Sequence, residues 1–551
     1  MFDSSRDGLE TAVLQDPDSE VGVVMPVNLS ENRGVVKAAM ILAIGNVTSR
    51  VLGLAREIVK SNLFGTSGLL SAYTVAALVP MTLFNLITGG EMVSSSLVPV
   101  FSDYASKEKR EELWGVVSTF LSVAIVLLVL MVGLVELFAP QVAWLVGARN
   151  FEDASLTQVS ISLMRLATPA LLFLSVASIL TGVLYALERF TLPAFTAAVF
   201  NGTIVVVALL RPNRIESLAW GVLLGSLLQI VLQWPALRDG RLRWQFDWHH
   251  PAIRRIIILY APIVAGLVVN QVAIWISYNL ATRTGDSSVT FMTYATTLYQ
   301  FPLGLVVTAL SMATLPTLSQ LATAFQTAES ETAVSHVREF KATLAGGLRL
   351  VITLILPAAA GLFALAGPII ALLLEHGQFT PADTAMTARV LRVYLFGLPF
   401  AAVDQMLVFA SYARKDTWRP ALAGVISIVI YTITAVFLLR PIGLFSLMVA
   451  DATKHFIHAM LMLWLLQRHL GGLAGHQIGQ NTLKSVLAAA LTGVAAWFVA
   501  NWLASLPFTG FLFKLSVVGG GGLAGLVVYV LAVWLLDIPE AKSLPRLLRR
   551  R

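Results

Sequence analysis

The sequence predicts an all-α polytopic membrane protein with about fourteen transmembrane helices: two six-helix lobes in a parallel pseudo-repeat, followed by two C-terminal helices. Three observations predict this fold. Hydrophobic residues make up 57% of the 551 residues and charged residues only 13%, whereas a soluble domain has about 25% charged residues. Apolar stretches of bilayer-spanning length recur along the chain. Short motifs also return about 220 residues apart.

Each spanning helix is expected where an apolar stretch reaches about 20 residues. These stretches cover residues 35–62, 68–103, 113–139, 157–187, 192–211, 217–237, 254–282, 288–322, 343–375, 383–413, 419–439, 443–467, 482–505 and 512–536. Several exceed 30 residues, so tilt, kinks or extension beyond the bilayer are expected. Prolines inside them, such as Pro169 and Pro262, are candidate kinks.

The division of the chain follows from these helices. Residues 1–33 form a polar tail without an apolar core, predicted to be disordered and cytoplasmic. Residues 34–240 form the N-lobe (helices 1–6) and residues 241–470 the C-lobe (helices 7–12). Helices 13 and 14 occupy residues 471–537, and residues 538–551 form a basic cytoplasmic tail.

The repeat consists of motif pairs in the same order in both halves. The pairs are Tyr73–Pro80 with Tyr294–Pro302, Val98–Ser102 with Leu315–Ser319, and Tyr185–Pro193 with Tyr412–Pro420. A unit of six helices is even, so both halves have the same orientation in the membrane. Their axis then runs along the membrane normal, and a substrate site is expected between the lobes.

Loop charges orient the helices. If the N-terminus is cytoplasmic, about twenty Lys and Arg residues lie on that side and about five on the other. This positive-inside asymmetry predicts that both termini are cytoplasmic.

The first helix carries an unusual polar stripe. Asn46, Arg50 and Glu57 share one face, while Arg56 and Lys60 are four residues apart. A charge at bilayer depth costs a few kcal/mol or more, so such residues usually face a protein interior or a water-filled cavity. Guanidinium groups fit phosphate oxygens, which favours an anion-binding wall. The alternative is that Arg56 and Lys60 extend to the membrane interface from a helix end.

A second stripe comprises Asp451, Lys454, His455 and His458 on one helical face. A proton or cation relay, a metal site and a self-neutralising ion-pair cluster are the three interpretations. The helical spacing favours the ion-pair cluster, and no metal site is predicted because further ligands would be needed. Glu91 and Asp404 are further ionisable residues within apolar helices.

Enzyme signatures and cysteine are absent from the sequence. It has no cysteine, no phosphate-binding Gly-rich loop, no HExxH and no GxSxG. We therefore predict a transporter, not an enzyme, without a cofactor or nucleic-acid partner. A membrane potential, an ion gradient (Na⁺ or H⁺) or the substrate gradient would drive it.

The chain resembles the MviN/MurJ lipid II flippase family of the MOP exporter superfamily, whose fold is shared by MATE exporters. The resemblance covers residues 35–536 and rests on Ser49–Glu57 in the first helix, Pro80, Val98-Pro99, Tyr294-Ala295 and Phe301-Pro302. It implies a V-shaped transporter of the bacterial inner membrane that alternates between inward-open and outward-open states.

The resemblance also implies the substrate and its site. The substrate would be an undecaprenyl-pyrophosphate-linked peptidoglycan precursor, with its lipid tail in a groove beside the last two helices. Arg50 and Arg56 match the family's helix-one arginines, which hold the pyrophosphate. Predicted substrate-binding residues are Asn46, Arg50, Arg56, Glu57, Asn85, Thr297 and Gln300. Predicted coupling or gating residues are Glu91, Asp404, Asp451, Lys454, His455 and His458. Predicted partners are the lipid-linked glycan precursor, membrane phospholipids and cell-wall synthesis proteins.

The chain departs from the family at several cavity positions that usually carry a charge. These positions hold Ser71, Phe84, Asn85, Gly89 and Thr297 here. Two explanations stay open: Lys454, Arg392 or Arg165 supplies the missing charge, or the substrate differs. The alternatives to a lipid II flippase are a MATE-like exporter of drugs, cations or another polysaccharide lipid, and a transport-inactive assembly scaffold.

Overall fold

The helices of the N-lobe follow the predicted order. The computed structural model describes residues 29–247, 249–327, 330–473 and 475–540. The N-lobe contains α1 (Leu29–Phe64), α2 (Gly68–Ile87), α3 (Gly90–Met92), the π-helical turn η1 (Val93–Leu97), α4 (Val98–Ser102), α5 (Arg110–Leu137), α6 (Ala139–Leu145), α7 (Ala154–Ala167), α8 (Ala170–Ala186), α9 (Thr196–Leu210) and α10 (Glu216–Gln233).

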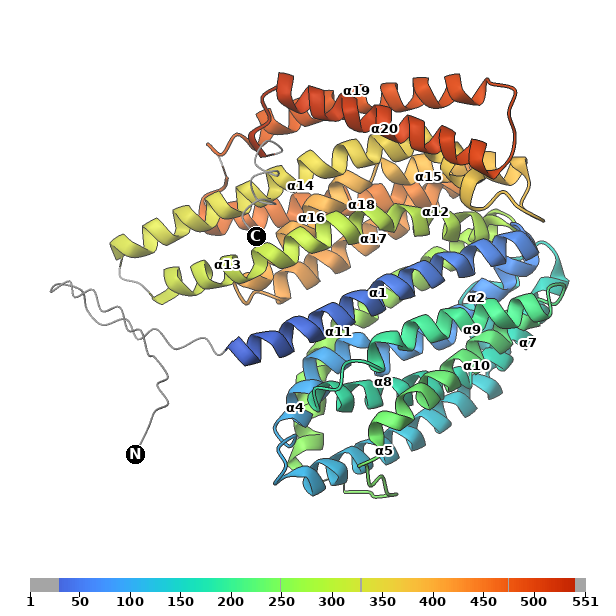
Figure 1. The fold of residues 1–551 in the computed structure, drawn as a ribbon, viewed down its shortest axis with the longest axis vertical. Helices are drawn as coiled ribbons and strands as arrows, with labels where there is room; N and C mark the ends of the chain where they lie inside the picture. The colour runs from blue at the N-terminus through green and yellow to red at the C-terminus, as the bar shows by residue number, and fades with distance from the viewer. Residues whose placement is uncertain (1–28, 248, 328–329, 474, 541–551) are drawn as a thin grey trace, which may run out of the picture.

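The C-lobe and the last two helices complete the chain. They comprise α11 (Pro251–Ala281), α12 (Ser288–Pro302), the π-helical turn η6 (Leu303–Val307), α13 (Thr308–Thr327), α14 (Ser330–Leu373), α15 (Pro381–Leu395), α16 (Leu398–Ala413), α17 (Trp418–Ile442), α18 (Phe445–Leu470), α19 (Ile478–Ala504) and α20 (Phe511–Leu535). In Figure 1 the C-lobe lies above the N-lobe, and α1 runs between them.

Two predicted boundaries differ from the structure or fall outside it. α1 begins at Leu29, inside the segment 1–33 that we expected to be a tail. Leucine, glutamate and arginine in residues 29–33 are good helix formers, so the first helix extends into this polar segment. Residues 1–28 and 541–551 of the two predicted tails lie outside the described residues.

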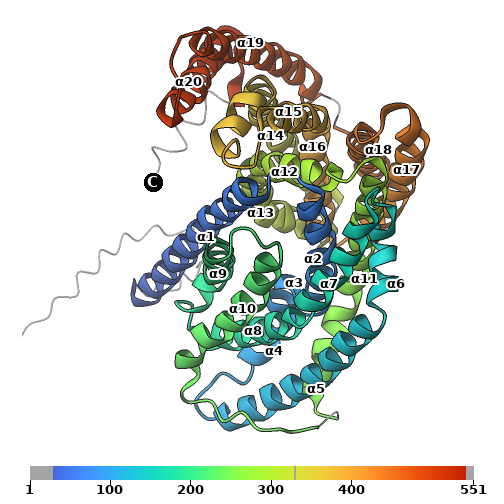
Figure 2. The ribbon, with the colours of Figure 1, turned by 90° about the vertical axis from the view of Figure 1, so that its right-hand side faces the viewer.

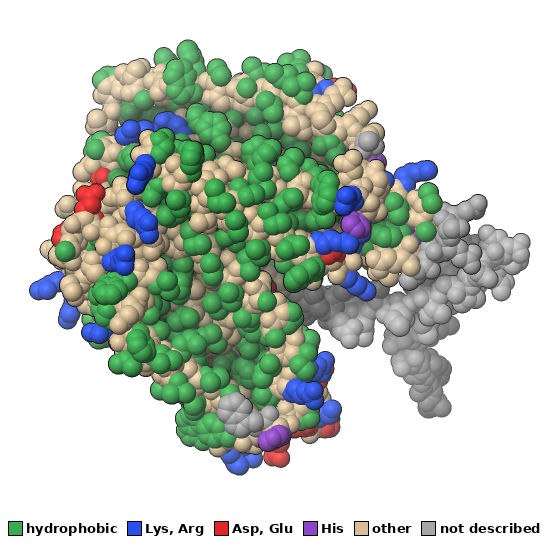
Figure 3. All heavy atoms as spheres, turned by 180° about the vertical axis from the view of Figure 1, so that it is seen from behind, with side chains coloured by type: hydrophobic (Ala, Val, Ile, Leu, Met, Phe, Trp, Pro, Cys, Tyr) green, Lys and Arg blue, Asp and Glu red, His purple; other side chains and the backbone are tan. Residues whose placement is uncertain are grey.

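The number of membrane spans agrees with the prediction of about fourteen. Among the described residues, twelve helices are long and apolar enough to cross a membrane, and the bent pair α15–α16 brings the number to thirteen. α18 is not among them, because the ionisable stripe interrupts its apolar sequence. Figure 3 shows a broad hydrophobic belt with Lys and Arg side chains gathered towards its two edges. The all-α polytopic fold is therefore confirmed.

Two predicted continuous helices are broken at corresponding places in the two lobes. The helix expected over 157–187 divides into α7 and α8 at Thr168-Pro169, and the helix expected over 383–413 divides into α15 and α16, which bend by 45°. Pro169 causes the first break because proline lacks the amide hydrogen that an α-helix requires.

The repeat is also visible in backbone conformation. Glu188, just after α8, has φ 58°, and Lys415, just after α16, has φ 60°. Each lies in the same turn: the Glu188 amide donates to the Tyr185 carbonyl, and the Lys415 amide to the Tyr412 carbonyl. Because left-handed backbone is rare for residues with a β-carbon, this shared turn supports the predicted parallel pseudo-repeat.

The lobes contact each other at one end of the molecule. Near the end of α1, one apolar cluster combines N-lobe residues such as Phe64 and Tyr73 with C-lobe residues such as Tyr294 and Phe379. Towards the opposite end the apolar clusters are separate, one built mainly from the N-lobe and one from the C-lobe. Figure 2 shows α2, α7 and α12 grouped where the lobes meet. The structure is therefore closed at the end where α1 finishes.

Hydrogen bonds reinforce this closure. The Thr66 hydroxyl donates to Asp383 at 2.5 Å, and the Gln378 amide donates to the Asn62 carbonyl at 2.9 Å. Asp286, just before α12, accepts from the Glu152 amide at 2.8 Å. These contacts join loops and helix ends, which can separate without breaking a helix.

α11 is shared between the two lobes, although the predicted boundary placed it wholly in the C-lobe. Its first half, with Ile256 and Tyr260, belongs to the N-lobe apolar cluster, and the Tyr260 hydroxyl donates to the Leu86 carbonyl. Its second half contacts both lobes. The Trp275 indole N–H donates to the Thr82 hydroxyl of α2 at 3.0 Å, and Ser277 interacts with Tyr431 of α17. Pro262 lies between the two halves. A long helix that is apolar on several sides can pack on both lobes, so α11 links them.

Candidate functional site

An ion-pair network lies on α1 near the closed end. Glu57 accepts from Arg56 at 2.9 Å and from Lys60 at 2.8 Å, and its side chain is only 7% exposed. Arg56 also donates through Nη1 to the side-chain oxygen of Asn201 on α9, at 2.9 Å. Lys60 is buried, whereas the Arg56 side chain stays 31% exposed. Two cations and one carboxylate give the network a net charge of +1. Within the network, only the Arg56 side chain is exposed enough to contact a ligand.

Arg50 differs from Arg56 because it has no partner. The described part of the chain contains no hydrogen bond or ion pair to its exposed guanidinium. This group lies against the C-lobe: its Nη1 atom would be 3.7 Å from a β-carbon at Gly304 in η6. Asn46, one turn earlier on α1, is also exposed. An unpaired guanidinium at an interlobe position is suited to bind an anion.

The remaining predicted substrate-binding residues differ in accessibility. Asn85 on α2 and Gln300 on α12 are exposed. Thr297 is half-buried, and its hydroxyl donates to the Thr293 carbonyl, so it is engaged within its own helix. Glu91 is exposed directly after the break between α2 and α3. A carboxylate in the first turn of a helix is favoured by the helix dipole.

The second stripe forms a compact cluster with a residue from another helix. Asp404 of α16 accepts hydrogen bonds from His455, at 3.3 Å, and from His458, both on α18. Lys454 donates to Asp451 at 2.6 Å, and His455 Nε2 lies 3.9 Å from Asp451. The structure therefore brings all these predicted residues together, and their opposite charges compensate one another.

His458 has a hydrogen-bonding partner at each of its two ring nitrogens. Its Nδ1 faces the Asp404 carboxylate and its Nε2 lies 3.3 Å from the Pro420 carbonyl. Both partners can accept hydrogen bonds, so each ring nitrogen lies opposite an acceptor. The geometry matches the self-neutralising interpretation. Among the described residues no group of three His, Asp or Glu could hold a metal ion.

Replacing Asp404 with asparagine is expected to destabilise the protein by roughly 2–4 kcal/mol, because the substitution removes the buried carboxylate that both His455 and His458 contact. The midpoint of thermal unfolding in one detergent measures the effect. Asp416→Asn is the matched control: it removes a partly exposed partner of Arg419 and should cost less than about 1 kcal/mol. An Asp404→Asn variant that is stable but loses transport would instead assign the cluster to coupling.

Comparison with known proteins identifies the family of this chain. Residues 60–518 match the family described as Lipid II flippase MurJ. The chain belongs to this family. The MurJ proteins are transporters, so the predictions of a transporter and not an enzyme, and of a multi-pass inner-membrane protein, are confirmed by membership.

Relatives and solved structures agree with this assignment. A probable lipid II flippase MurJ of Bdellovibrio bacteriovorus is 28% identical over 84% of this chain and 87% of its own length. A probable lipid II flippase MurJ of Vibrio cholerae is 29% identical over 86% of this chain and 91% of its own length. A MurJ structure in an inward closed conformation matches with TM-score 0.71 at 23% identity, covering 90% of this chain and 98% of its own. An inward-facing MATE family transporter matches with TM-score 0.61 at 13% identity, covering 79% and 98%, which shows the common fold.

The structure accounts for two of the positions at which this chain differs from the MurJ pattern. Ser71 is fully buried between the lobes, and its hydroxyl pairs with that of Thr290 at 2.9 Å, so a neutral pair occupies the place of an acidic residue. Gly89 has no room for a side chain, because a β-carbon there would lie 2.9 Å from the Asn85 backbone. A charged residue at either position would require different packing.

The candidate replacements for the missing charge are engaged elsewhere. Lys454 pairs with Asp451, and Arg392 donates to the Phe363 carbonyl at 3.1 Å. Arg165 on α7 is exposed, and Glu136 of α5 lies close enough to interact with its charge. Arg50 and Arg56 are therefore the principal cations of the candidate site.

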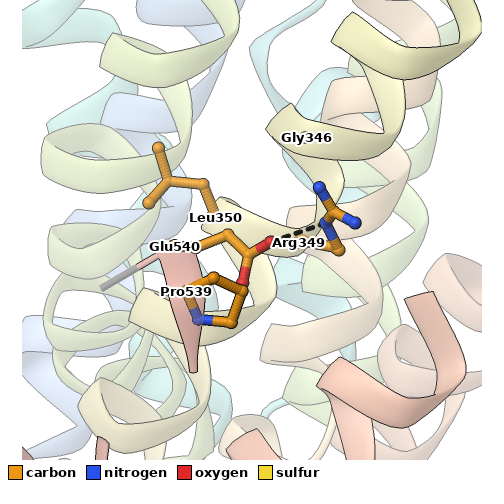
Figure 4. A pocket seen from close by; sticks show the side chains of 5 residues that line it. All are labelled: Gly346, Arg349, Leu350, Pro539 and Glu540. Carbon is orange, nitrogen blue, oxygen red and sulfur yellow. Dashed lines mark ion pairs between the residues drawn. The ribbon is translucent and has the colours of Figure 1, made fainter. Parts of the chain in front are cut away.

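The last two helices are fixed to the C-lobe through α14. Both helices donate a hydrogen bond to Thr353 of α14. Asn481 of α19 donates to its hydroxyl at 3.1 Å, and Tyr529 of α20 donates to its carbonyl at 2.7 Å. Figure 4 shows a neighbouring pocket of about 320 Å³ in which Arg349 and Glu540 face each other, 2.6 Å apart. This ion pair ties the segment after α20 to α14.

Sequence reasoning missed two partners in the site. Asn201, which holds Arg56, lies 145 residues away; its only signal is an amide within the apolar stretch 192–211. The pairing of Asp404 with the histidines of α18 was also missed, although each residue was identified separately. Neither pairing has a spacing that a single helix would reveal.

Proposed function

We propose that this protein moves lipid II, an undecaprenyl-pyrophosphate-linked peptidoglycan precursor, from the cytoplasmic to the outer leaflet of the bacterial inner membrane. The observation that supports it most is the match to the MurJ family over residues 60–518. The unpaired guanidinium of Arg50 between the lobes supplies the anion-binding group that a pyrophosphate requires.

The transport cycle follows from where the lobes meet. With both termini cytoplasmic, as the loop charges predict, α1 ends at the periplasmic side. Contacts such as Thr66 with Asp383 and Ser71 with Thr290 then close the periplasmic end. In the proposed cycle, a substrate headgroup enters from the cytoplasmic side and binds at Arg50 and Arg56. The periplasmic contacts then open while the lobes approach each other at the cytoplasmic end.

The membrane potential is the proposed driving force. A pyrophosphate diester carries about two negative charges, and the cell interior is electrically negative. Moving one charge across 100 mV changes the free energy by about 2.3 kcal/mol. Outward movement of an anionic headgroup is therefore favoured without a coupling ion. The prenyl tail would stay in lipid beside α19 and α20.

Functional replacement tests the proposal. Expression of this chain in a bacterium depleted of its own lipid II flippase is expected to restore growth and to return lipid II to the outer leaflet. Immunoblotting of membranes controls for expression. Unrestored growth together with lipid II retained in the inner leaflet, despite normal membrane levels, would contradict lipid II as the substrate.

A further inference from the structure

A pocket outside the interlobe site lies between the start of α5 and the segment that joins α10 to α11. Its volume is about 440 Å³, and its lining includes Arg110 and Trp114 of α5 and Arg241 and Arg243 of the connecting segment. Figure 1 places α5 on the side of the N-lobe that is remote from the C-lobe. The pocket is therefore separate from the proposed transport path.

The connecting segment is held along α5 in an extended conformation. The Arg243 amide donates to Ser118 at 3.1 Å, and the Gln245 amide donates to Ser122 at 3.2 Å. Two residues of extended chain span about 6.6 Å and four residues of helix about 6 Å, so the two spacings match. Alternation along an extended chain then directs Arg241, Arg243 and Gln245 to one side.

The pocket contains buried donors without acceptors. Trp114 is only 3% exposed, and its indole N–H has no acceptor within the described part of the chain. The same holds for Nη1 of Arg110. A buried donor without a partner costs free energy, which a ligand rich in acceptor oxygens would recover.

The acidic residues of the pocket interact with nearby arginines without burying them. Asp239 pairs with Arg189, which lies outside the lining, at 2.6 Å; this hydrogen bond, with a smaller contribution from the positive charge of Arg110, holds the pKa of Asp239 below its usual value. Glu111 lies 3.6 Å from Arg241, but the two side chains are 92% and 72% exposed. Water and salt weaken such an exposed pair.

The pocket lies at the level of the lipid headgroups along the membrane normal. α5 has 28 residues and is about 42 Å long, whereas the hydrocarbon core is about 30 Å thick. Its first turns therefore extend into the headgroup region. Trp244 and Phe246 beside the pocket are 67% and 52% exposed, and their rings stack at 5.9 Å. Exposed aromatic rings of this kind are typical of the membrane interface.

We propose that this pocket binds the phosphate group of an anionic phospholipid in the leaflet at which α5 begins. Arg110, Arg243 and the Trp114 N–H donate hydrogen bonds to the phosphate oxygens. The acyl chains lie along the apolar surface of α5. This lipid is a bound component of the N-lobe and not the transported substrate, so the site is independent of the proposed function.

The full-length protein in detergent tests the proposal by native mass spectrometry with phosphatidylglycerol and phosphatidylcholine of identical acyl chains. Phosphatidylglycerol is expected to bind at least about tenfold more tightly. Arg110→Gln and Arg243→Gln should each weaken it about tenfold, the loss of one charge-assisted bond. Trp114→Phe keeps the ring and should weaken binding by about threefold. Arg254→Gln, an exposed arginine outside the pocket lining, is the matched control and should leave binding unchanged.

Three results would overturn the site. The first is equal affinity for the two lipids. The second is an equal effect of Arg254→Gln and Arg243→Gln, which would indicate diffuse attraction to the surface. The third is binding of inorganic phosphate in place of the lipid, with no preference for phosphatidylglycerol. Unchanged midpoints of thermal unfolding without added lipid establish that the variants are folded.

Discussion

Arg50→Ala is expected to lower lipid II transport by at least about tenfold while expression and thermal stability stay unchanged. A charge-assisted hydrogen bond to an anion contributes about 1.5–3 kcal/mol, and each 1.4 kcal/mol corresponds to a factor of ten. Arg50 has no partner in the described structure, so its removal leaves no other group unpaired. Growth of a flippase-depleted bacterium and the amount of lipid II in the outer leaflet measure the effect.

Two further variants separate charge from geometry at this site. Arg50→Lys keeps the charge but loses the planar, two-pronged guanidinium, so partial activity is expected. Arg56→Ala should reduce both transport and stability, because Glu57 loses one of its two cationic partners. Full transport by Arg50→Ala would rule out Arg50 as the pyrophosphate-binding group.

A disulfide across the closed end is expected to abolish transport reversibly. The chain contains no cysteine, so Ser71→Cys combined with Thr290→Cys introduces one defined pair. The two native hydroxyl oxygens are 2.9 Å apart, and both side chains are buried between α2 and α12. Oxidation should join the lobes and reduce transport to background, and a reducing agent should restore it.

The two single-cysteine variants are the controls for this experiment. Each keeps a side chain similar in size to the native one and should retain transport under oxidising conditions. Mass spectrometry of the oxidised double variant establishes that the bond has formed. If the cross-linked protein still transports at the normal rate, the lobes do not need to separate at this end, and the proposed alternating cycle is wrong.

Hydropathy predicted the helices well for a physical reason. In a bilayer every backbone polar group must be bonded within the protein, which leaves long helices as the simplest solution for an apolar sequence. The expected helix at 482–505 therefore agrees closely with α19 (Ile478–Ala504). Pro169 was predicted as a kink, but the apolar pattern continues through it, so hydropathy alone did not show that the helix divides into α7 and α8 there.

Only part of the candidate site could be predicted from the sequence. Helical spacing placed Arg50 with Asn46, and Asp451 with His455, because residues three or four apart share a face. It could not pair Asp404 with His458, 54 residues away, since that contact depends on how α16 and α18 pack. The role of Thr297 at the substrate stays a prediction; its hydroxyl donates to the Thr293 carbonyl of its own helix.

The sequence by itself determined the spanning helices, the six-helix repeat and the two polar stripes, because these follow from local composition and periodicity. The tertiary structure decided which charges are neutralised and which stay free. Arg56 and Lys60 share Glu57, whereas Arg50 faces the opposite lobe unpaired. It also decided which end of the molecule is closed, because that depends on contacts between residues more than 200 positions apart, such as Ser71 with Thr290.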